Sequence, residues 1–303
     1  MPEENLREAN EINETAEAAP VVPVVAVVLA AGFGTRFDPD NPKQLVSVGG
    51  RPIVCWSIEA FERTPRVTDI VVVVNPKVRA EVETLIAARG YAKVRVVIDG
   101  GAERVDSTAA ALDTLAAAGI PEDAKILIHD AVRPFVAASS IEGSIDALDR
   151  YHAATVAVPS TDTILLTHTL GDDETVRAVP ERPHTFRAQT PQSFRFGLIR
   201  RAYALAASDP DFHPTDDTRV VVDYLPEEPV AIVEGSETNL KITTLADMPT
   251  AERIAADLAG RPGATAVAAP GAAPGAASGE GGMGKEEARA RMHEILMRAA
   301  SRM

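Results

Sequence analysis

The residues best suited to chemistry stand in short loops that each follow an apolar run. The first loop reads Leu29-Ala30-Ala31-Gly32-Phe33-Gly34-Thr35-Arg36, and Pro42-Lys43-Gln44 comes shortly after it. Small residues let the backbone approach a phosphate chain closely, and N–H groups at such a turn form a cradle for an anion. Arg36 and Lys43 add positive charge. The pattern favours a phosphate site, although a tight turn with surface cations accounts for this loop alone about as well.

A second loop combines a pair of glycines with polar side chains. It reads Asp99-Gly100-Gly101-Ala102-Glu103-Arg104-Val105-Asp106-Ser107. Its backbone N–H groups and the Ser107 hydroxyl can hydrogen-bond the edge of a nucleotide base, while Arg104 can face a phosphate or pair with a carboxylate. The plainer alternative for this segment is a helix cap.

The third loop, His129-Asp130-Ala131-Val132-Arg133-Pro134, places a carboxylate at the end of an apolar run. Magnesium in proteins takes one or two carboxylates together with substrate phosphates and water. Asp130 beside a triphosphate loop is therefore a candidate ligand for Mg²⁺. We expect His129 to be an oriented structural residue, because no second His lies at metal-ligand spacing.

The elements that must position these loops follow from the apolar runs. The runs predict strands at 24–30, 70–74, 94–98, 125–129 and 155–158, with helix-like stretches at 51–63, 77–89, 103–118 and 138–150. Unbroken apolar strands are typical of burial on both faces, and strands that alternate with helices indicate a parallel sheet. We predict a doubly wound, mostly parallel, Rossmann-like α/β fold. Ligands of such folds bind at the carboxyl ends of the strands, where all three loops stand.

Composition divides the chain into four predicted regions. Residues 1–22 are Glu-rich and predict a disordered leader, whereas 23–259 hold the globular domain. Within that domain, residues from about 160 to 190 interrupt the strand and helix pattern and predict an extended β-arm. Residues 260–284 are almost entirely Gly, Ala, Pro and Ser and predict a flexible linker, and 285–303 predict an amphipathic helix.

Charge and cysteine content exclude several classes of protein. The formal net charge of −14 argues against non-specific binding to nucleic acid or to an anionic membrane. The single cysteine, Cys55, stands in an apolar stretch, so it forms no internal disulfide and suits a reducing compartment. No apolar run is long enough to cross a membrane. We therefore expect a cytoplasmic protein whose anionic substrates bind at a local basic site.

Taken together, these segments resemble the nucleotidyltransferases, and over about residues 24–258 the chain is similar to the 2-C-methyl-D-erythritol 4-phosphate cytidylyltransferase family. The resemblance rests on an ordered set of motifs. Beyond the three loops described above, these are Asp162-Thr163, Arg182, Thr190-Pro191-Gln192, Thr215-Asp216-Asp217 and Asn239-Leu240-Lys241. A helix N-cap with acidic residues in the first turn accounts for Thr215-Asp216-Asp217 equally well.

The resemblance implies a role for each motif residue. The cytosine would be surrounded by Ala30, Ala31, Gly101, Ala102 and Ser107, and the rest of the nucleotide would lie along Gly32, Gly34, Arg104 and Ala131. The triphosphate would be held by Arg36 and Lys43, Mg²⁺ by Asp130, and both substrates' phosphates by Lys241. Arg133, Thr163 and Arg182 would bind the sugar phosphate. Since the arms of two subunits interlock in this family, the resemblance also implies a homodimer in which each arm serves the neighbouring site.

The implied reaction transfers CMP from CTP to 2-C-methyl-D-erythritol 4-phosphate in the non-mevalonate isoprenoid pathway. A phosphate monoester has a second pKa of about 6, so the acceptor is already largely ionised and needs no strong base. Catalysis then reduces to placement and charge neutralisation by Arg36, Lys43, Lys241 and Mg²⁺. The lack of a Ser-His-Asp or Cys-His arrangement agrees with direct displacement.

Three other functions can be compared with this one. A ribitol-5-phosphate cytidylyltransferase shares the fold and most of the motifs. A non-catalytic nucleotide-binding regulatory protein predicts missing cations or a missing carboxylate, yet Lys43, Asp130 and Lys241 are present. A dinucleotide-dependent oxidoreductase fails because Phe37 stands where the fingerprint needs its third Gly.

Overall fold

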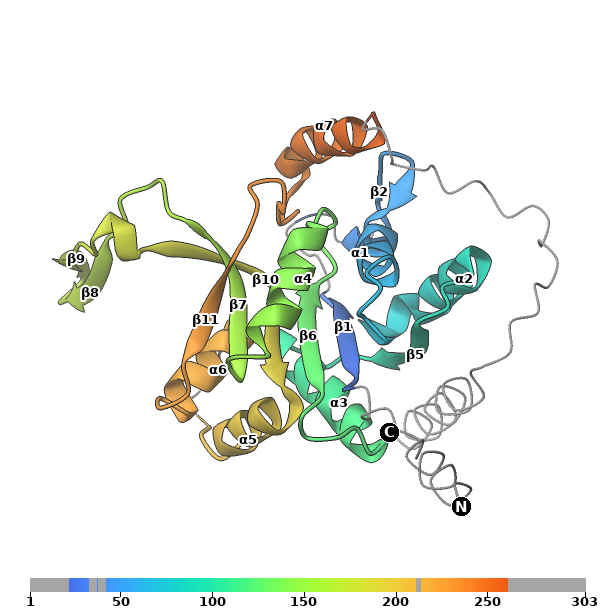
Figure 1. Ribbon diagram of the computed structural model, residues 1–303. Helices are drawn as coiled ribbons and strands as arrows, with labels where there is room; N and C mark the ends of the chain where they lie inside the picture. The colour runs from blue at the N-terminus through green and yellow to red at the C-terminus, as the bar shows by residue number, and fades with distance from the viewer. Residues whose placement is uncertain (1–21, 33–36, 38–41, 211–213, 261–303) are drawn as a thin grey trace, which may run out of the picture.

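The computed structural model describes residues 22–32, 37, 42–210 and 214–260 of the 303-residue chain. Seven strands form one sheet in the order β11-β7-β10-β6-β1-β4-β5 (Figure 1). Neighbours pair in parallel except around one strand, which runs antiparallel between β7 and β6. The strands are β1 (Val24–Ala30), β4 (Asp69–Val74), β5 (Val94–Asp99), β6 (Lys125–Asp130), β7 (Ala153–Pro159), the antiparallel β10 (Phe186–Arg195) and β11 (Val230–Glu234).

Helices cover both faces of the sheet (Figure 1). Successive residues of β1 point to opposite faces, so Val25 and Val27 join one core cluster while Ala26 and Val28 join the other. One cluster packs under α3 (Arg104–Ala117), α5 (Phe196–Ala206) and α6 (Asp217–Tyr224). The other packs under α1 (Ile53–Glu62), α2 (Arg79–Arg89) and α4 (Ala138–Ala147). Every residue of β1 is buried, which explains its unbroken apolar sequence.

A two-stranded hairpin projects away from the body of the molecule (Figure 1). It pairs β8 (Leu166–Leu170) with β9 (Asp173–Ala178) and is followed by the short helix η3 (Arg182–His184). The side chains of this arm are largely exposed, including Leu170 at 66% and Val176 at 55%. The chain then returns to the sheet as β10.

A smaller apolar cluster lies beside the sheet, under the last described helix. Helix α7 (Met248–Ala259) packs on the hairpin of β2 (Ser47–Val48) and β3 (Arg51–Pro52), near the amino end of α1. Trp56 and Phe135 meet edge to face in this region, with ring centroids 5.3 Å apart. Three short helices complete the described elements: η1 (Lys43–Leu45), η2 (Pro76–Val78) and η4 (Leu245–Asp247).

The predicted α/β architecture is confirmed, with strands and helices within two or three residues of the predicted ranges. The predicted arm at about 160–190 needs a correction, because residues 186–190 belong to β10 in the middle of the sheet. Pro191 and the polar residues around it argue against a central strand, which is why sequence reasoning missed it. No helix among the described residues is long and apolar enough to span a membrane.

Candidate active site

Ten of the predicted site residues meet where the strand order reverses. From β1 the sheet continues to β4 on one side, whereas β6 lies on the other, so the carboxyl ends of β1 and β6 flank the crevice at which doubly wound sheets bind ligands. A cavity of about 270 Å³ opens there. It is lined by Leu29, Ala30, Ala31, Gly32, Lys43, Gln44, Gly101, Ala102, Glu103, Arg104, Ser107, Asp130, Val132 and Lys241.

The glycine pair lets α3 begin close to the end of β1. A Cβ atom on Gly100 would lie 2.4 Å from the Ala31 Cβ and 2.7 Å from the Ser107 Oγ, which is closer than real Cβ atoms come. A Cβ on Gly101 would meet the Cβ of Asp106 at 2.2 Å. The two glycines are therefore required by packing at one wall of the cavity.

The start of α3 is capped by its own side chains. Glu103 and Asp106 form a capping box, in which the Glu103 N–H donates to the Asp106 Oδ2 at 2.9 Å. The Ser107 hydroxyl donates to the Glu103 carbonyl at 3.1 Å and accepts from the Gly101 N–H at 3.2 Å. The helix-cap interpretation of this loop is thus correct, and the same turn also lines the cavity.

Asp130 ends β6 between two cations. Its Oδ1 lies 3.0 Å from the Arg104 Nε, and its Oδ2 lies 2.9 Å from the Lys241 Nζ. Burial alone would raise the pKa of Asp130, but Arg104 and Lys241 outweigh burial and hold that pKa well below its usual range. Asp130 is therefore a carboxylate at every physiological pH.

Arg104 also contacts a second carboxylate, on α6. Its Nη1 donates to the Asp217 Oδ2 at 2.7 Å, and Tyr203 donates its hydroxyl proton to the Asp217 Oδ1 at 2.6 Å. Burial lowers the pKa of Arg104, yet Asp217 and Asp130 more than compensate and raise it above its usual value. Burial and the adjacent Asp217 raise the pKa of Tyr203, so its hydroxyl stays protonated and donates.

The histidine before Asp130 joins β6 to β10. Its Nε2 lies 3.0 Å from the Arg133 carbonyl oxygen, which only accepts, so Nε2 carries the proton. Its Nδ1 then accepts from the Thr190 hydroxyl at 2.9 Å, and that hydroxyl accepts from the Asp130 N–H at 3.2 Å. Burial lowers the pKa of His129 to about 4, which keeps the ring neutral. His129 is a structural residue, as predicted.

Lys241 is held in place by the loop after β11. The buried Asn239 donates to the Gln189 Oε1 at 3.1 Å and to the Thr190 carbonyl at 2.9 Å. The Ile242 N–H donates to the Val132 carbonyl at 2.9 Å. These bonds fix both sides of Lys241 against β10 and against the loop after β6.

The other predicted residues lie outside the cavity lining. Ala131 is fully buried behind it, and its N–H donates to the Leu29 carbonyl at 2.9 Å. Arg133 donates to the carbonyls of Asn239 and Ala188, at 2.9 and 3.3 Å. Thr163 and Arg182 lie on the exposed arm, 3.3 Å apart between the Arg182 Nη2 and the Thr163 Oγ1. Gly34 and Arg36 fall outside the described residues, as do residues 1–21 and 261–303 with the predicted leader, linker and terminal helix.

Sequence reasoning missed the polar residues behind Arg104. Tyr203 was not predicted to take part, and Asp217 was interpreted either as part of a family motif or as a first-turn helix residue. The helix-cap account holds for Asp216, whose Oδ1 accepts from the Arg219 N–H at 2.8 Å. The only available signal for Asp217 was an acidic residue at the start of an apolar helix face, and such residues are common at helix N-termini.

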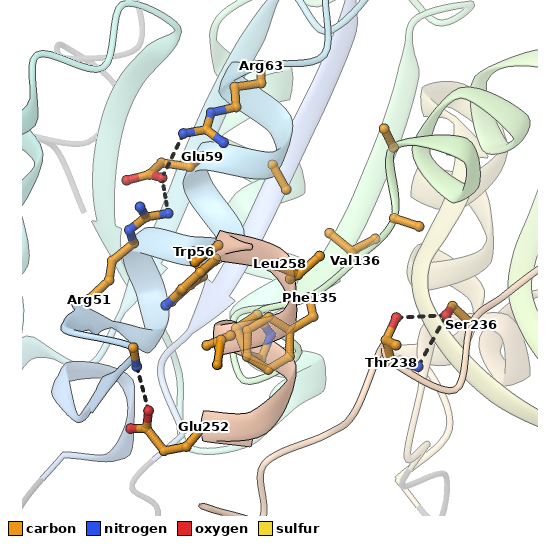
Figure 2. Close-up of a pocket in the computed structure, with 18 residues that line it drawn as sticks. Arg51, Trp56, Glu59, Arg63, Phe135, Val136, Ser236, Thr238, Glu252 and Leu258 are labelled. Carbon is orange, nitrogen blue, oxygen red and sulfur yellow. Dashed lines mark hydrogen bonds and ion pairs between the residues drawn. The ribbon is translucent and has the colours of Figure 1, made fainter. Parts of the chain in front are cut away.

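A larger cleft, of about 750 Å³, lies elsewhere on the molecule (Figure 2). It opens between α1, α7 and the loop 134–138, with Trp56, Phe135 and Leu258 along its apolar floor and Arg51 paired with Glu59 at one side. None of the predicted site residues lines it. Size alone therefore does not identify the chemical site of this protein.

The small cavity suits a nucleoside triphosphate better than a metal cluster. Lys43, Arg104 and Lys241 supply positive charge, and the turn at Gly101–Ala102 supplies backbone polar groups. Among the described residues, no group of three or more His, Cys, Asp and Glu side chains is arranged to hold a metal ion. A divalent cation at Asp130 would thus share its coordination with substrate phosphates, which is how Mg²⁺ is commonly bound.

Comparisons with known proteins agree with this geometry. The sequence profile of the 2-C-methyl-D-erythritol 4-phosphate cytidylyltransferase family matches residues 24–257. A 2-C-methyl-D-erythritol 4-phosphate cytidylyltransferase of Bifidobacterium longum (strain DJO10A) is 71% identical over 276 residues, covering 91% of this chain and 88% of that protein. A crystal structure of 4-diphosphocytidyl-2C-methyl-D-erythritol synthase from Anaerococcus prevotii DSM 20548 matches with a TM-score of 0.65 at 27% identity, over 77% of this chain and 97% of that chain.

A second kind of relative is also similar. A bifunctional ribulose 5-phosphate reductase/CDP-ribitol pyrophosphorylase of Haemophilus influenzae is 35% identical over 227 residues, which cover 75% of this chain and 47% of that protein. The profile match at 24–257 includes every residue that lines the small cavity.

Proposed function

Because the chain belongs to the 2-C-methyl-D-erythritol 4-phosphate cytidylyltransferase family, we propose that the cavity between β1, α3 and β6 is its active site. The enzyme is a cytidylyltransferase of isoprenoid precursor biosynthesis. It transfers CMP from CTP to 2-C-methyl-D-erythritol 4-phosphate and releases pyrophosphate and 4-diphosphocytidyl-2-C-methyl-D-erythritol. The observation that carries the site assignment is Asp130, buried and ionised between Arg104 and Lys241 on the cavity wall.

The cytosine binds against the turn between β5 and α3. Gly101, Ala102 and Ser107 line the cavity with small side chains and polar groups, opposite Ala30 and Ala31. Backbone N–H and C=O groups at such a turn can pair with a base edge, and small residues leave room for the ring. The ribose and phosphates then extend along Gly32 toward Lys43.

The reaction is a direct displacement at the α-phosphorus of CTP. A phosphate oxygen of the acceptor forms the new P–O bond, and the bond from the α-phosphorus to the bridging oxygen breaks, so that pyrophosphate leaves with the bonding electrons. Lys43 and Lys241, together with Arg36, neutralise charge on the phosphoryl oxygens. Lys241 also brings the two anionic substrates together, because it stands at the mouth of the cavity beside Asp130.

Asp130 is the residue that would hold Mg²⁺. When bound, the cation supplies charge neutralisation and orientation of the triphosphate. The donor set fits, since one carboxylate plus nucleotide phosphates satisfies Mg²⁺. Asp130 is ionised, and Arg104 and Lys241 occupy its oxygens. We propose that the Lys241 side chain shifts toward phosphate oxygens when the nucleotide and the cation bind, which frees the Asp130 Oδ2 while Arg104 keeps its contact with the Oδ1.

The arm carries the acceptor-side residues to a second subunit. Thr163 and Arg182 are exposed, and the hairpin of β8 and β9, which lies between them in the chain, projects away from the body of the molecule (Figure 1). Exposed apolar side chains at Leu166, Leu170 and Val176 support an interface there. We propose a homodimer in which Thr163 and Arg182 bind the sugar phosphate at the neighbouring subunit's cavity, and Arg133 binds it from beside its own cavity. The use of CTP and the buried single cysteine support a cytoplasmic location.

Pyrophosphate release from CTP and Mg²⁺ tests the assignment. The assay compares 2-C-methyl-D-erythritol 4-phosphate with ribitol 5-phosphate, because one relative is a CDP-ribitol pyrophosphorylase. We expect rapid release with the erythritol phosphate and CTP, and little with ATP, GTP or UTP. A preference for ribitol 5-phosphate would replace the proposed acceptor, and silence with both acceptors would overturn catalysis at this site.

A further inference from the structure

We infer that Asp217 is a positioning residue, which holds Arg104 at the nucleotide cavity and thereby sets the affinity for CTP. The inference rests on the proposed function, since it assigns Arg104 to the nucleotide. Asp217 itself lines no part of the small cavity, and it lies 113 positions along the chain from Arg104. It acts on the substrate only through the guanidinium group.

Asp217 is fully buried, and both oxygens of its carboxylate are hydrogen-bonded. Its carboxylate accepts from the Arg104 Nη1 at 2.7 Å and from the Tyr203 hydroxyl at 2.6 Å. Its backbone N–H donates to the Gln192 Oε1 at 2.8 Å, which ties the start of α6 to β10. A buried carboxylate is costly unless it is paired and hydrogen-bonded. The free-energy cost of burying the Asp217 carboxylate is offset by its ion pair with Arg104, and this pair holds the arginine in place.

The ion pairs at Asp130 join two cations and two carboxylates once Asp217 is included. Arg104 and Lys241 are the cations, and Asp130 and Asp217 are the carboxylates they contact. Without Asp217, Arg104 would have Asp130 as its only ionic partner in this set. The arginine would then compete more strongly with a nucleotide-bound cation for Asp130. With Asp217 present, Arg104 is shared between two carboxylates and keeps a fixed orientation.

The orientation of Arg104 leaves one buried nitrogen without a partner in the described part of the chain. Its Nε faces Asp130 and its Nη1 faces Asp217, whereas the buried Nη2 has no hydrogen-bond partner among the described residues. Buried donors in native structures are nearly always satisfied, so an acceptor on the bound nucleotide would complete this set. A guanidinium held at two edges presents its third nitrogen in a fixed direction.

The neighbouring residue provides a matched control. Asp216 carries the same side chain one position earlier, but its carboxylate caps α6 through the Arg219 N–H and makes no contact with Arg104. Asn caps helices about as well as Asp. The substitution Asp216→Asn therefore removes a negative charge at the same helix end, without touching the link to Arg104.

The first experiment measures CTP binding by calorimetry and steady-state kinetics in Asp217→Asn, Tyr203→Phe and Asp216→Asn. We expect Asp217→Asn to weaken CTP binding and raise KM for CTP about 10-fold or more, as for loss of one charged hydrogen bond. The KM for the acceptor should change less than about twofold. Tyr203→Phe should also raise the KM for CTP, by a smaller factor. Asp216→Asn should have the same KM for CTP as the wild type. A purely structural role would lower the amount of folded enzyme and its melting temperature while both KM values stayed unchanged, and that result would overturn the inference.

A double-mutant cycle with Arg104→Gln tests whether Asp217 acts through Arg104. If it does, Asp217→Asn adds little to the loss of CTP affinity already caused by Arg104→Gln. Multiplicative losses in the double variant would show that Asp217 acts by another route, and would overturn the inference. Failure of the proposed function is a distinct result, because the wild-type chain itself would then neither bind CTP nor turn it over.

Discussion

At the scale of single residues, the site is organised around one carboxylate, Asp130, whose two oxygens and backbone N–H all have partners. Asp130 is ionised because Arg104 and Lys241 offset the effect of its burial on the pKa. Its N–H is bonded to Thr190, which in turn is bonded to His129. A carboxylate fixed in this way is pre-organised, and pre-organised charge is the main source of rate acceleration in phosphoryl transfer.

The charged residues at the reacting phosphates should matter far more than charges elsewhere. We expect Lys43→Ala and Asp130→Asn each to lower kcat about 100-fold or more, because each removes charge stabilisation at the transition state. The measurement is pyrophosphate release at saturating CTP and acceptor. Arg253→Ala is the control, since Arg253 is an exposed cation on α7. Near-wild-type rates in either active-site variant would show that the site is assigned to the wrong residues.

Single residues also mark the limit of what the sequence reveals about the site. Ten of the sequence-predicted site residues line one cavity, among them Ala30, Gly101, Ser107 and Lys241, because loops after parallel strands meet at one edge of the sheet. Asp217 was not assigned to Arg104, since a contact between residues 113 positions apart depends on how α5 and α6 pack on the sheet. Periodicity and local motifs carry no information about such pairs.

At the scale of elements, the junction of β6 and β10 gives the protein a pH-dependent weakness. His129 is neutral, with its pKa lowered by burial from 6.5 to about 4. Between pH 4 and 6.5, His129 is therefore protonated in the unfolded chain and neutral in the folded chain. The stability that His129 confers is complete above pH 6.5 and is lost as the pH falls toward 4.

Urea unfolding as a function of pH measures this effect. We expect the free energy of unfolding to fall by roughly 3 kcal/mol between pH 6.5 and 4, because folding lowers the pKa of His129 from 6.5 to about 4. His129→Gln keeps a donor and an acceptor but cannot titrate, so its curve should be flatter above about pH 4.5, where most carboxylates stay ionised. His168→Gln, at an exposed histidine of the arm, should keep the wild-type slope. An unchanged slope in His129→Gln would mean that another group causes the acid sensitivity.

Elements differ in how well they could be predicted. Strands β1, β4 and β6 are buried along their whole length, and their apolar runs identify them directly. Strand β10 is equally central but contains Thr190-Pro191-Gln192-Ser193, a polar run that usually indicates a loop. Its polar side chains are buried because they bond to β6, α6 and the 236–239 loop, which are tertiary contacts.

At the scale of the whole molecule, the arm should couple two active sites. Light scattering after gel filtration tests the dimer, and we expect Leu166→Asp with Leu170→Asp to produce monomers with little activity, since a charge in an apolar interface is costly. Leu205→Asp is the control, because Leu205 is an exposed apolar residue of α5 outside the arm.

Subunit mixing tests which site each arm serves. Arg182→Ala impairs an arm and Lys43→Ala impairs a cavity, so an equal mixture of the two variants should recover up to about a quarter of the wild-type sites after exchange. Recovery of activity requires that arm and cavity come from different chains. No recovery from stable mixed dimers would place Arg182 in its own subunit's site.

The position of β10 constrains how the chain can be assembled during translation. Strands β6 and β7 leave the ribosome before β10, yet β10 lies between them and pairs with both. The strands therefore cannot all pair in the order in which they are synthesised. After β1, β4, β5 and β6 have paired, one edge of β6 stays unpaired until β10 has been synthesised. An unpaired edge of this kind invites association with other chains. Nascent chains that stall before residue 186 would lack both the strand that covers β6 and the Lys241 that completes the cavity, so they would be candidates for chaperone binding and not for catalysis.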